Sequence, residues 1–155
     1  MNSSPELDNK DWKILEALQQ DARQSLSALG KRIGLSQPAV SERIRKLEEA
    51  GVIEGYGARL NLQKLGYGLQ ALIRLRARHD ELAAFIATCA TMPEVLEMYR
   101  ITGEDCFSLR CAIARPQELE RVIDLLSRYG AVTTAIVLSK PLDKPVGRVP
   151  TQPGR

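Results

Sequence analysis

The sequence predicts an α+β fold in two parts: an N-terminal winged helix-turn-helix domain, followed by a ferredoxin-like β-α-β-β-α-β sandwich. Two observations predict this division. Apolar residues recur at helical spacing through residues 8–51, whereas from residue 69 onward they alternate with polar residues in short runs. Between the two patterns lies a glycine-containing stretch, residues 61–68, which we expect to be a linker. The 155 residues suffice for two small domains.

The first helix is expected to run from Asp8 to about Gln20. The Asp8 side chain can cap the N-terminus, and Asp11 places a favourable negative charge in the first turn. Apolar residues at helical spacing form the stripe that we expect to be buried: Ile14, Leu15, Leu18 and Ala22.

Two short helices joined by a tight turn follow. The second helix begins near Ser25 or Ser27 and ends at Gly34, because glycine adopts the left-handed conformation that terminates helices. The third begins with Ser36 as N-cap and has Pro38 in its first turn, where the missing N–H costs nothing. This layout is typical of a helix-turn-helix, in which the second helix of the pair enters the DNA major groove.

The third helix has a polar, basic outward face. Gln37 and Ser41 suit contacts with base edges, and the basic residues suit phosphates, which position a protein without reading sequence. The alternative is a solvated surface helix of an ordinary helical bundle. The predicted DNA-binding residues are Ser36, Gln37, Pro38, Ser41, Glu42, Arg43, Arg45 and Lys46.

A small wing is expected after the third helix. Residues 52–60 contain two short β-like runs around Gly55 and Gly57, a pattern that favours a hairpin. The DNA-binding domain would therefore span residues 1–60, with the linker at 61–68.

The C-terminal half shows the order strand, helix, strand, strand, helix, strand, which is the ferredoxin-like split unit. The expected elements are strands near 69–78, 95–102, 106–113 and 132–139 and helices near 80–90 and 116–130. Both helices would cover one face of the sheet. The other face mixes apolar and arginine side chains, so we expect the domain to dimerise through that face. This domain would span residues 69–140. The Pro- and Gly-rich residues 141–155 would form a flexible tail.

Composition and cysteine usage exclude several classes of protein. No apolar run approaches the length of a transmembrane helix, and the first residues lack the pattern of a signal peptide, so we expect a cytoplasmic protein without a membrane partner. Cys89, Cys106 and Cys111, with His79 as the single histidine, match neither a disulfide framework nor a zinc pattern. We therefore expect reduced thiols, no metal and no cofactor.

Three strings resemble blocks of the Lrp/AsnC family, the leucine-responsive and asparagine-responsive bacterial regulators. They are LDNKDWKIL, ARQSLSALGKRIGLSQPAVSERIRKLEEAGVIEGYGARLN and ITGEDCFSLR, and the resemblance covers residues 7 to about 140. It implies a transcriptional regulator that binds double-stranded DNA and senses a small molecule, usually an amino acid. It also implies a homodimer, often assembled into an octamer of four dimers. The effector-binding residues that it implies are Thr102, Gly103, Glu104, Asp105, Cys106 and Thr134.

The residues around Gly103 also support an effector site on physical grounds. Glycine permits close backbone approach, turn N–H groups can hold a carboxylate, and a neighbouring acidic side chain can hold an ammonium group. The alternative is a plain hairpin turn. Many family members have an acidic residue three positions after this glycine, where this chain has Cys106. Strand alternation places the Cys106 side chain on the sheet face opposite to that of Phe107, where it would line an interface. A redox or metal role for Cys106 is the lesser alternative.

An enzymatic function finds little support. Catalysis needs a nucleophile or acid–base pair with an orienting partner, and His79 lies at a strand end beside Asp80 without such a grouping. We predict a DNA-binding regulator that is not an enzyme. The alternative is an architectural DNA-binding protein without an effector.

Overall fold

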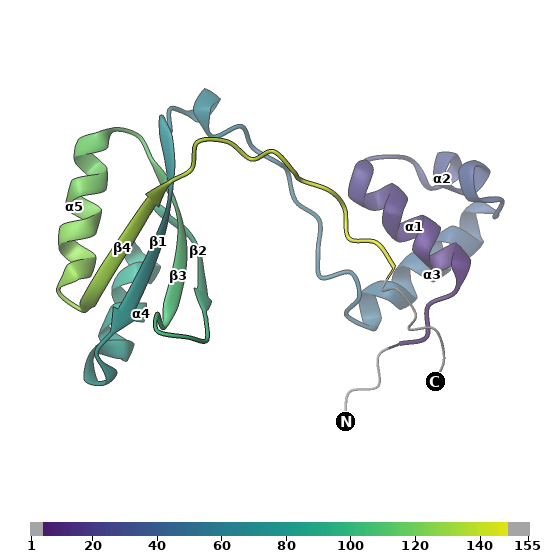
Figure 1. Cartoon of the computed structure of the whole chain (residues 1–155). Helices are drawn as coiled ribbons and strands as arrows, with labels where there is room; N and C mark the ends of the chain where they lie inside the picture. Colours follow the sequence, from purple (N-terminus) through teal and green to yellow (C-terminus); the bar gives the residue numbers. More distant parts are fainter. Residues whose placement is uncertain (1–4, 149–155) are drawn as a thin grey trace. The chain divides into compact units, whose positions relative to one another are not determined.

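A computed structural model describes residues 5–148, and the chain divides into two compact units. The first contains the chain up to Ala58 together with the chain from Leu142 onward, and we call it the helix-turn-helix unit. The second, Arg59–Pro141, we call the sheet unit (Figure 1). Within residues 5–148, no helix is long and apolar enough to cross a membrane.

The described part of the helix-turn-helix unit contains the three predicted helices, α1 (Asn9–Gln20), α2 (Leu26–Ile33) and α3 (Gln37–Glu49). Each begins at a side-chain cap. Asp8 accepts hydrogen bonds from the N–H groups of Lys10 (2.7 Å) and Asp11 (2.9 Å), and the Asp11 carboxylate accepts one from the Asp8 N–H (3.0 Å). Ser25 and Ser36 cap α2 and α3, as predicted for Ser36. These caps satisfy N–H groups that have no partner within the helix.

The turn between α2 and α3 depends on two glycines. Gly34 has φ +71°, in the left-handed region, and ends α2. The Leu35 N–H donates to the Gly30 carbonyl (2.9 Å), and a Cβ on Gly30 would lie 2.5 Å from the Leu35 carbonyl oxygen. The ammonium group of Lys10 donates to the Ile33 carbonyl at the end of α2. The core of the unit consists of Ile14, Ala17, Leu29, Ile33, Val40 and Leu47.

The predicted wing is wrong. Residues 52–60 form neither helix nor strand, and the next element is the short 3-10 helix η1 (Gln63–Leu65). The N–H groups of Val52 (2.9 Å) and Ile53 (3.1 Å) both donate to the Leu47 carbonyl, so this segment closes the end of α3. An isolated two-stranded hairpin is marginal in water, and glycines weaken strands further.

The sheet unit has the predicted β-α-β-β-α-β order. Its elements are β1 (Leu69–Ala77), η2 (His79–Glu81), α4 (Leu82–Thr91), β2 (Val95–Arg100), β3 (Phe107–Ile113), α5 (Pro116–Ser127) and β4 (Gly130–Ile136). The sheet is antiparallel with strand order β2-β3-β1-β4. β4 begins two residues earlier than predicted. Gly130 pairs with Ala77 there, and a Cβ on Gly130 would lie 2.1 Å from the Arg76 carbonyl oxygen.

Helices α4 and α5 pack on one face of the sheet (Figure 1). On β1, Ile73 and Leu75 point into this core, whereas Arg74 and Arg76 point to the open face. Phe85 of α4 is completely buried, and its ring centroid lies 5.0 Å from that of Phe107 and 5.8 Å from that of Tyr129. Ile86, the next residue, is 40% exposed, because it lies about 100° further around the helix than Phe85.

Candidate functional site

Helix α3 presents a polar face opposite its buried stripe of Val40 and Leu47. Gln37, Pro38 and Ser41 are exposed near the N-terminus of the helix. Gln37 and Ser41 carry the donors and acceptors that base edges require, and the first turns of a recognition helix are the part that reaches them. The structure therefore brings the predicted base-reading residues together on one accessible surface.

Arg45 lies on the same face between two carboxylates. Its guanidinium donates two hydrogen bonds to the Glu42 carboxylate, through Nη2 (2.7 Å) and Nε (3.0 Å). Its Nη1 donates a hydrogen bond to Glu49. The hydrogen bond that Arg45 donates to Glu42 lowers the pKa of Glu42, and the hydrogen bonds that Arg45 donates to Glu42 and Glu49 raise its own pKa. Lys46 is a more distant partner of Glu42, at 3.7 Å. All these side chains are at least half exposed, so the pairs are weak and phosphates can displace the carboxylates.

Arg43 forms ion pairs with two residues of the first helix cap. Its Nη1 atom lies 2.7 Å from Asp11 and 2.8 Å from Asp8, the two members of the α1 capping box. The hydrogen bonds to Asp11 and Asp8 raise the pKa of Arg43. This side chain ties the third helix to the start of the first and so positions the recognition face.

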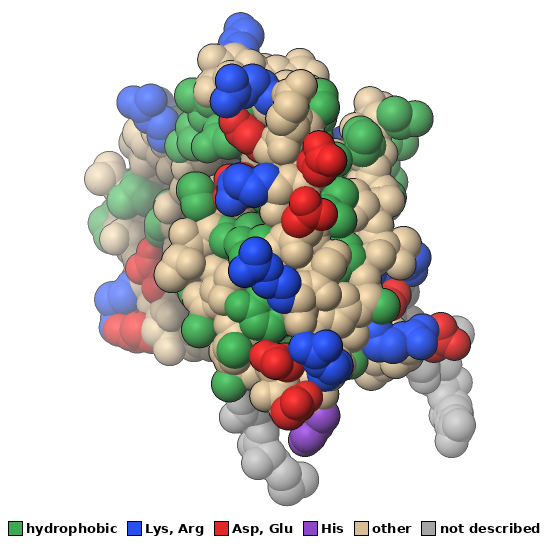
Figure 2. Space-filling model, turned by 90° about the vertical axis from the view of Figure 1, so that its left-hand side faces the viewer, with side chains coloured by type: hydrophobic (Ala, Val, Ile, Leu, Met, Phe, Trp, Pro, Cys, Tyr) green, Lys and Arg blue, Asp and Glu red, His purple; other side chains and the backbone are tan. Residues whose placement is uncertain are grey.

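The face of the sheet unit that carries α5 is mixed in charge. Figure 2 shows Lys and Arg side chains interspersed with Asp and Glu over this face. Arg121, for example, pairs with Glu94. Because charges of both signs are interspersed, this face has no field of one sign. A phosphate-binding surface needs a positive field.

The predicted effector residues 102–106 form the connection between β2 and β3. Gly103 has φ +111°, which favours glycine, and nothing lies within 4 Å of the place that a Cβ would occupy. The Cys106 N–H donates to the Leu75 carbonyl (2.8 Å), and the Ile101 N–H donates to the Cys106 carbonyl (3.0 Å). Thr102 and Glu104 are exposed, whereas Asp105 and Cys106 are half-buried.

Two arginines of β1 pair with this loop. Arg74 Nε lies 3.5 Å from Asp105, and Arg76 Nη2 lies 2.5 Å from Glu104. We did not predict these arginines as site residues, although their alternation on the open face of the first strand was visible in the sequence. The two ion pairs place two cations and two anions side by side. Arginine is complementary to the carboxylate of an amino acid, and Asp or Glu is complementary to its ammonium group.

Thr134 does not share this surface. It pairs with Ile73 of β1, and directly paired residues point to the same face, so Thr134 points to the helix-covered side. Its Oγ1 is buried and has no hydrogen-bond partner within residues 5–148. Thr133, which pairs with Arg74, is the β4 residue on the open face.

Comparison with known proteins decides the family. Residues 7–48 match the AsnC-type helix-turn-helix domain, and residues 70–146 match the Lrp/AsnC ligand binding domain. The chain belongs to the Lrp/AsnC family of transcriptional regulators. Both domains that define these regulators are therefore present: one for DNA and one for a small molecule.

Individual relatives match over most of the chain. It is 46% identical over 109 residues to the leucine-responsive regulatory protein of Rhizobium meliloti, covering 68% of this chain and 70% of that protein. The solved structure of Bacillus subtilis LrpC has a TM-score of 0.86 and 31% identity, over 90% of this chain and all of that one. The complex of Neisseria meningitidis NMB0573 with L-Met has a TM-score of 0.83 and 32% identity, over 90% of this chain and 94% of that one.

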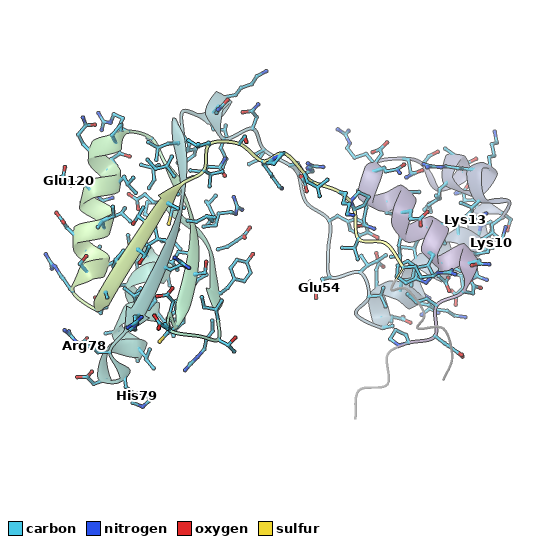
Figure 3. All side chains as sticks on the ribbon, viewed as in Figure 1. Lys10, Lys13, Glu54, Arg78, His79 and Glu120 are labelled. Atoms are coloured by element: carbon cyan, nitrogen blue, oxygen red, sulfur yellow. The ribbon has the colours of Figure 1, made fainter. Side chains whose placement is uncertain are left out.

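Two of the three thiols of this Lrp/AsnC protein, Cys89 and Cys111, are buried. Burial raises the pKa of Cys89 and of Cys111 to about 11, so both are protonated at neutral pH. Cys106 packs against the core cluster of the sheet unit rather than pointing only to an interface. Figure 3 shows His79 projecting outward beside Arg78. Within the described residues, no group of three or more metal-ligating side chains gathers.

The open sheet face of the Lrp/AsnC domain carries a further ion pair, between β3 and β2. Arg110 of β3 donates to Glu97 of β2, and the Tyr99 hydroxyl donates to the same carboxylate. These two hydrogen bonds, that of Arg110 first, lower the pKa of Glu97 to about 2. Because the carboxylate is about two-fifths exposed, the pair contributes modestly to stability.

The Glu97 pair predicts a pH dependence of stability. Since the folded pKa of about 2 lies below the ordinary 4.5, the contribution is complete above pH 4.5 and is lost as the pH falls through 2. Glu97→Gln should therefore lower the thermal midpoint at pH 7, and the gap from the unmodified protein should close between these pH values. Glu120→Gln, on the outer side of α5 (Figure 3), is the control and should leave the midpoint unchanged. A gap that is equally wide at both pH values would contradict the assignment.

Proposed function

We propose that this protein is a sequence-specific DNA-binding regulator whose sheet unit senses an amino acid. The observation that carries the proposal is the exposed face of α3, where Gln37, Ser41 and Arg45 lie together on a family-assigned helix-turn-helix. A relative with 32% identity has L-Met bound, which favours an amino acid as the effector. Because such a regulator acts on the chromosome, we place it in the cytoplasm.

DNA reading would divide between two sets of residues. Gln37 and Ser41 contact base edges, with Ser36 and Pro38 setting the start of the helix, while Arg45 and Lys46 contact phosphates. Arg43 serves by positioning α3 against α1. A dimer presents two such helices, so the operator should be roughly palindromic.

The effector would bind at the residue 102–106 loop. An amino acid carries one carboxylate and one ammonium group, and the arginines of β1 beside Glu104 and Asp105 offer both complementary charges. Asp105 takes the place of the acidic residue that Cys106 replaces, and backbone N–H groups around Gly103 approach the carboxylate. Thr134 lies outside this proposed site, because its side chain points to the helix-covered side of the sheet.

Regulation would follow from assembly. The open sheet face, with Leu72 44% and Tyr99 54% exposed, supports a dimer, and an octamer of four dimers is the larger assembly that we propose. An effector that binds one arrangement of dimers more tightly than another shifts the population toward it, by no more than its difference in affinity.

Arg45→Ala tests the DNA-binding half of the proposal. We expect weaker binding at all sequences and a salt slope reduced by about 0.9 for each phosphate that the variant no longer neutralises, because fewer counterions are released. The measurement is the anisotropy of a labelled duplex, obtained by selection from random sequence, over a salt series.

The matched control is Arg115→Ala, which removes an arginine from an i,i+3 pair with Glu118 in the sheet unit. This control should leave affinity and slope unchanged. Glu42→Gln should raise affinity, because it removes a carboxylate that competes with phosphate for Arg45. An Arg45→Ala protein with unchanged slope would count against the phosphate role.

A thermal-shift screen with the twenty amino acids tests the sensing half. A ligand present at 100- to 1,000-fold excess over its Kd stabilises by about 2–4 kcal/mol, so a true effector should raise the midpoint clearly. Asp105→Asn should abolish that shift, whereas Glu120→Gln should preserve it. The absence of a shift with every amino acid would favour a DNA-binding protein without an amino-acid effector.

A further inference from the structure

An apolar groove runs along the helix-turn-helix unit, on α1 and the segment after α3. Trp12, Leu15 and Leu18 line it from the helix, and Ile53 and Tyr56 line it from the segment. Tyr56 is 53% exposed, so the groove is open to solvent on that side. Val146, from near the other end of the same chain, is also part of the lining.

The tail segment, which we define as residues 142–148, is held by Gln19. The side-chain amide donates through Nε2 to the Val146 carbonyl (3.0 Å) and accepts through Oε1 from the Val146 N–H (2.7 Å). One side chain thus satisfies both backbone groups of one residue, as a neighbouring strand would. These two residues are separated by 127 positions in sequence, so local chain geometry does not impose the contact.

Arg148 makes a second attachment to the same stripe of α1. Its Nη2 donates to the Asn9 side-chain carbonyl (2.6 Å), and its guanidinium carbon lies 5.7 Å from the Trp12 ring centroid. That distance is typical of a cation–π contact. Asn9, Trp12 and Gln19 are spaced three and seven residues apart, which puts all three on one helix face.

We propose that the groove on α1 is the docking site of the tail segment of the same chain, which becomes a second tether of the helix-turn-helix unit. The chain passes between the two units twice: once after α3, at Ala58 and Arg59, and once after β4, at Pro141 and Leu142. The docked segment anchors the second connection on α1 and covers Trp12. This inference does not depend on which effector or operator the protein uses.

Trp12 is the only tryptophan in the chain, so its fluorescence reports docking directly. A chain ending at Pro141 should show a red-shifted emission and stronger acrylamide quenching than the full chain, because water reaches the indole. Full-length Gln19→Ala and Arg148→Ala should each shift in the same direction and guard against misfolding of the shortened chain. Arg115→Ala, in the sheet unit, should leave the spectrum unchanged. An unchanged Trp12 signal in the shortened chain and in both variants would overturn the proposal.

A synthetic peptide of residues 142–148 should rescue the shortened chain. Titrating it should restore the blue-shifted emission with saturation, and Gln19→Ala should weaken its affinity roughly 5- to 30-fold, because two hydrogen bonds are removed. Saturation with equal affinity for both proteins would overturn the role of Gln19.

Mixed dimers identify which chain supplies the tail. We expect Trp12 of a shortened chain to remain exposed when that chain pairs with full-length Trp12→Phe, since each tail docks on its own unit. Protection of Trp12 in the mixed dimer would show that the tail crosses to a second copy, and would overturn the assignment to the same chain.

Discussion

Replacing Phe85 with alanine is expected to lower the free energy of unfolding of the sheet unit by about 3–5 kcal/mol. The ring is completely buried between Phe107 and Tyr129, with centroid distances of 5.0 Å and 5.8 Å. Truncation removes both aromatic contacts and leaves a cavity below α4. It also loosens Tyr129, whose hydroxyl lies 2.7 Å from the Thr88 hydroxyl of the same helix as Phe85.

The neighbouring residue supplies the control for Phe85→Ala. Ile86 is 40% exposed on the same helix, so Ile86→Ala should cost much less than Phe85→Ala. Urea unfolding followed by far-UV circular dichroism measures both, while Trp12 fluorescence follows the helix-turn-helix unit separately. Equal losses for the two variants would contradict the placement of Phe85 at the centre of the core.

Gly30→Ala is expected to destabilise the helix-turn-helix unit by about 3 kcal/mol, at the upper end of the usual cost of overpacking. The new Cβ would lie 2.5 Å from the Leu35 carbonyl oxygen, a backbone atom in the tight turn, and 3.5 Å from Val40 Cγ2. The chain can relieve this clash only by opening the turn, which moves α3 relative to α2. We therefore expect loss of DNA binding together with loss of stability.

Gly57→Ala is the matched control for Gly30→Ala. Nothing lies within 4 Å of a Cβ built on Gly57, and its φ is not positive, so alanine fits there. This substitution should be neutral or slightly stabilising, because it restricts the unfolded chain. Trp12 fluorescence in a urea titration, with duplex anisotropy beside it, measures both variants. A Gly30→Ala protein as stable as Gly57→Ala would show that the turn is looser than the structure indicates.

Arg43 illustrates how packing assigns roles within a basic cluster. In sequence, Arg43, Arg45 and Lys46 are alike, and all three were predicted to bind phosphate. In the structure Arg43 bridges to Asp8 and Asp11 across 35 and 32 residues, whereas the partners of Arg45 among residues 5–148 lie within its own helix. Proteins with Arg43→Ala and Arg45→Ala should therefore fail differently, the first through stability and the second through the salt dependence of DNA binding.

The sequence by itself determined the helices, the strands and their order. Caps such as Asp8, Ser25 and Ser36 act within three residues, and the 3.6- and 2-residue periods of apolar side chains are local properties. Local signals also placed the left-handed Gly34 and the turn at Gly103. All of these features depend on interactions between residues that are close in the chain.

Only the tertiary structure decided which distant groups meet. Strand register set Thr134 against Ile73 rather than Arg74, and a shift of one residue would have turned that hydroxyl to the open face. Pairing across the sheet brought Arg74 to Asp105, and folding of the chain onto α1 brought Val146 to Gln19. The absent wing belongs here too, because a short hairpin needs a surface to pack on, and residues 52–53 instead bond the end of α3. Such contacts depend on three-dimensional packing, for which sequence periodicity carries no signal.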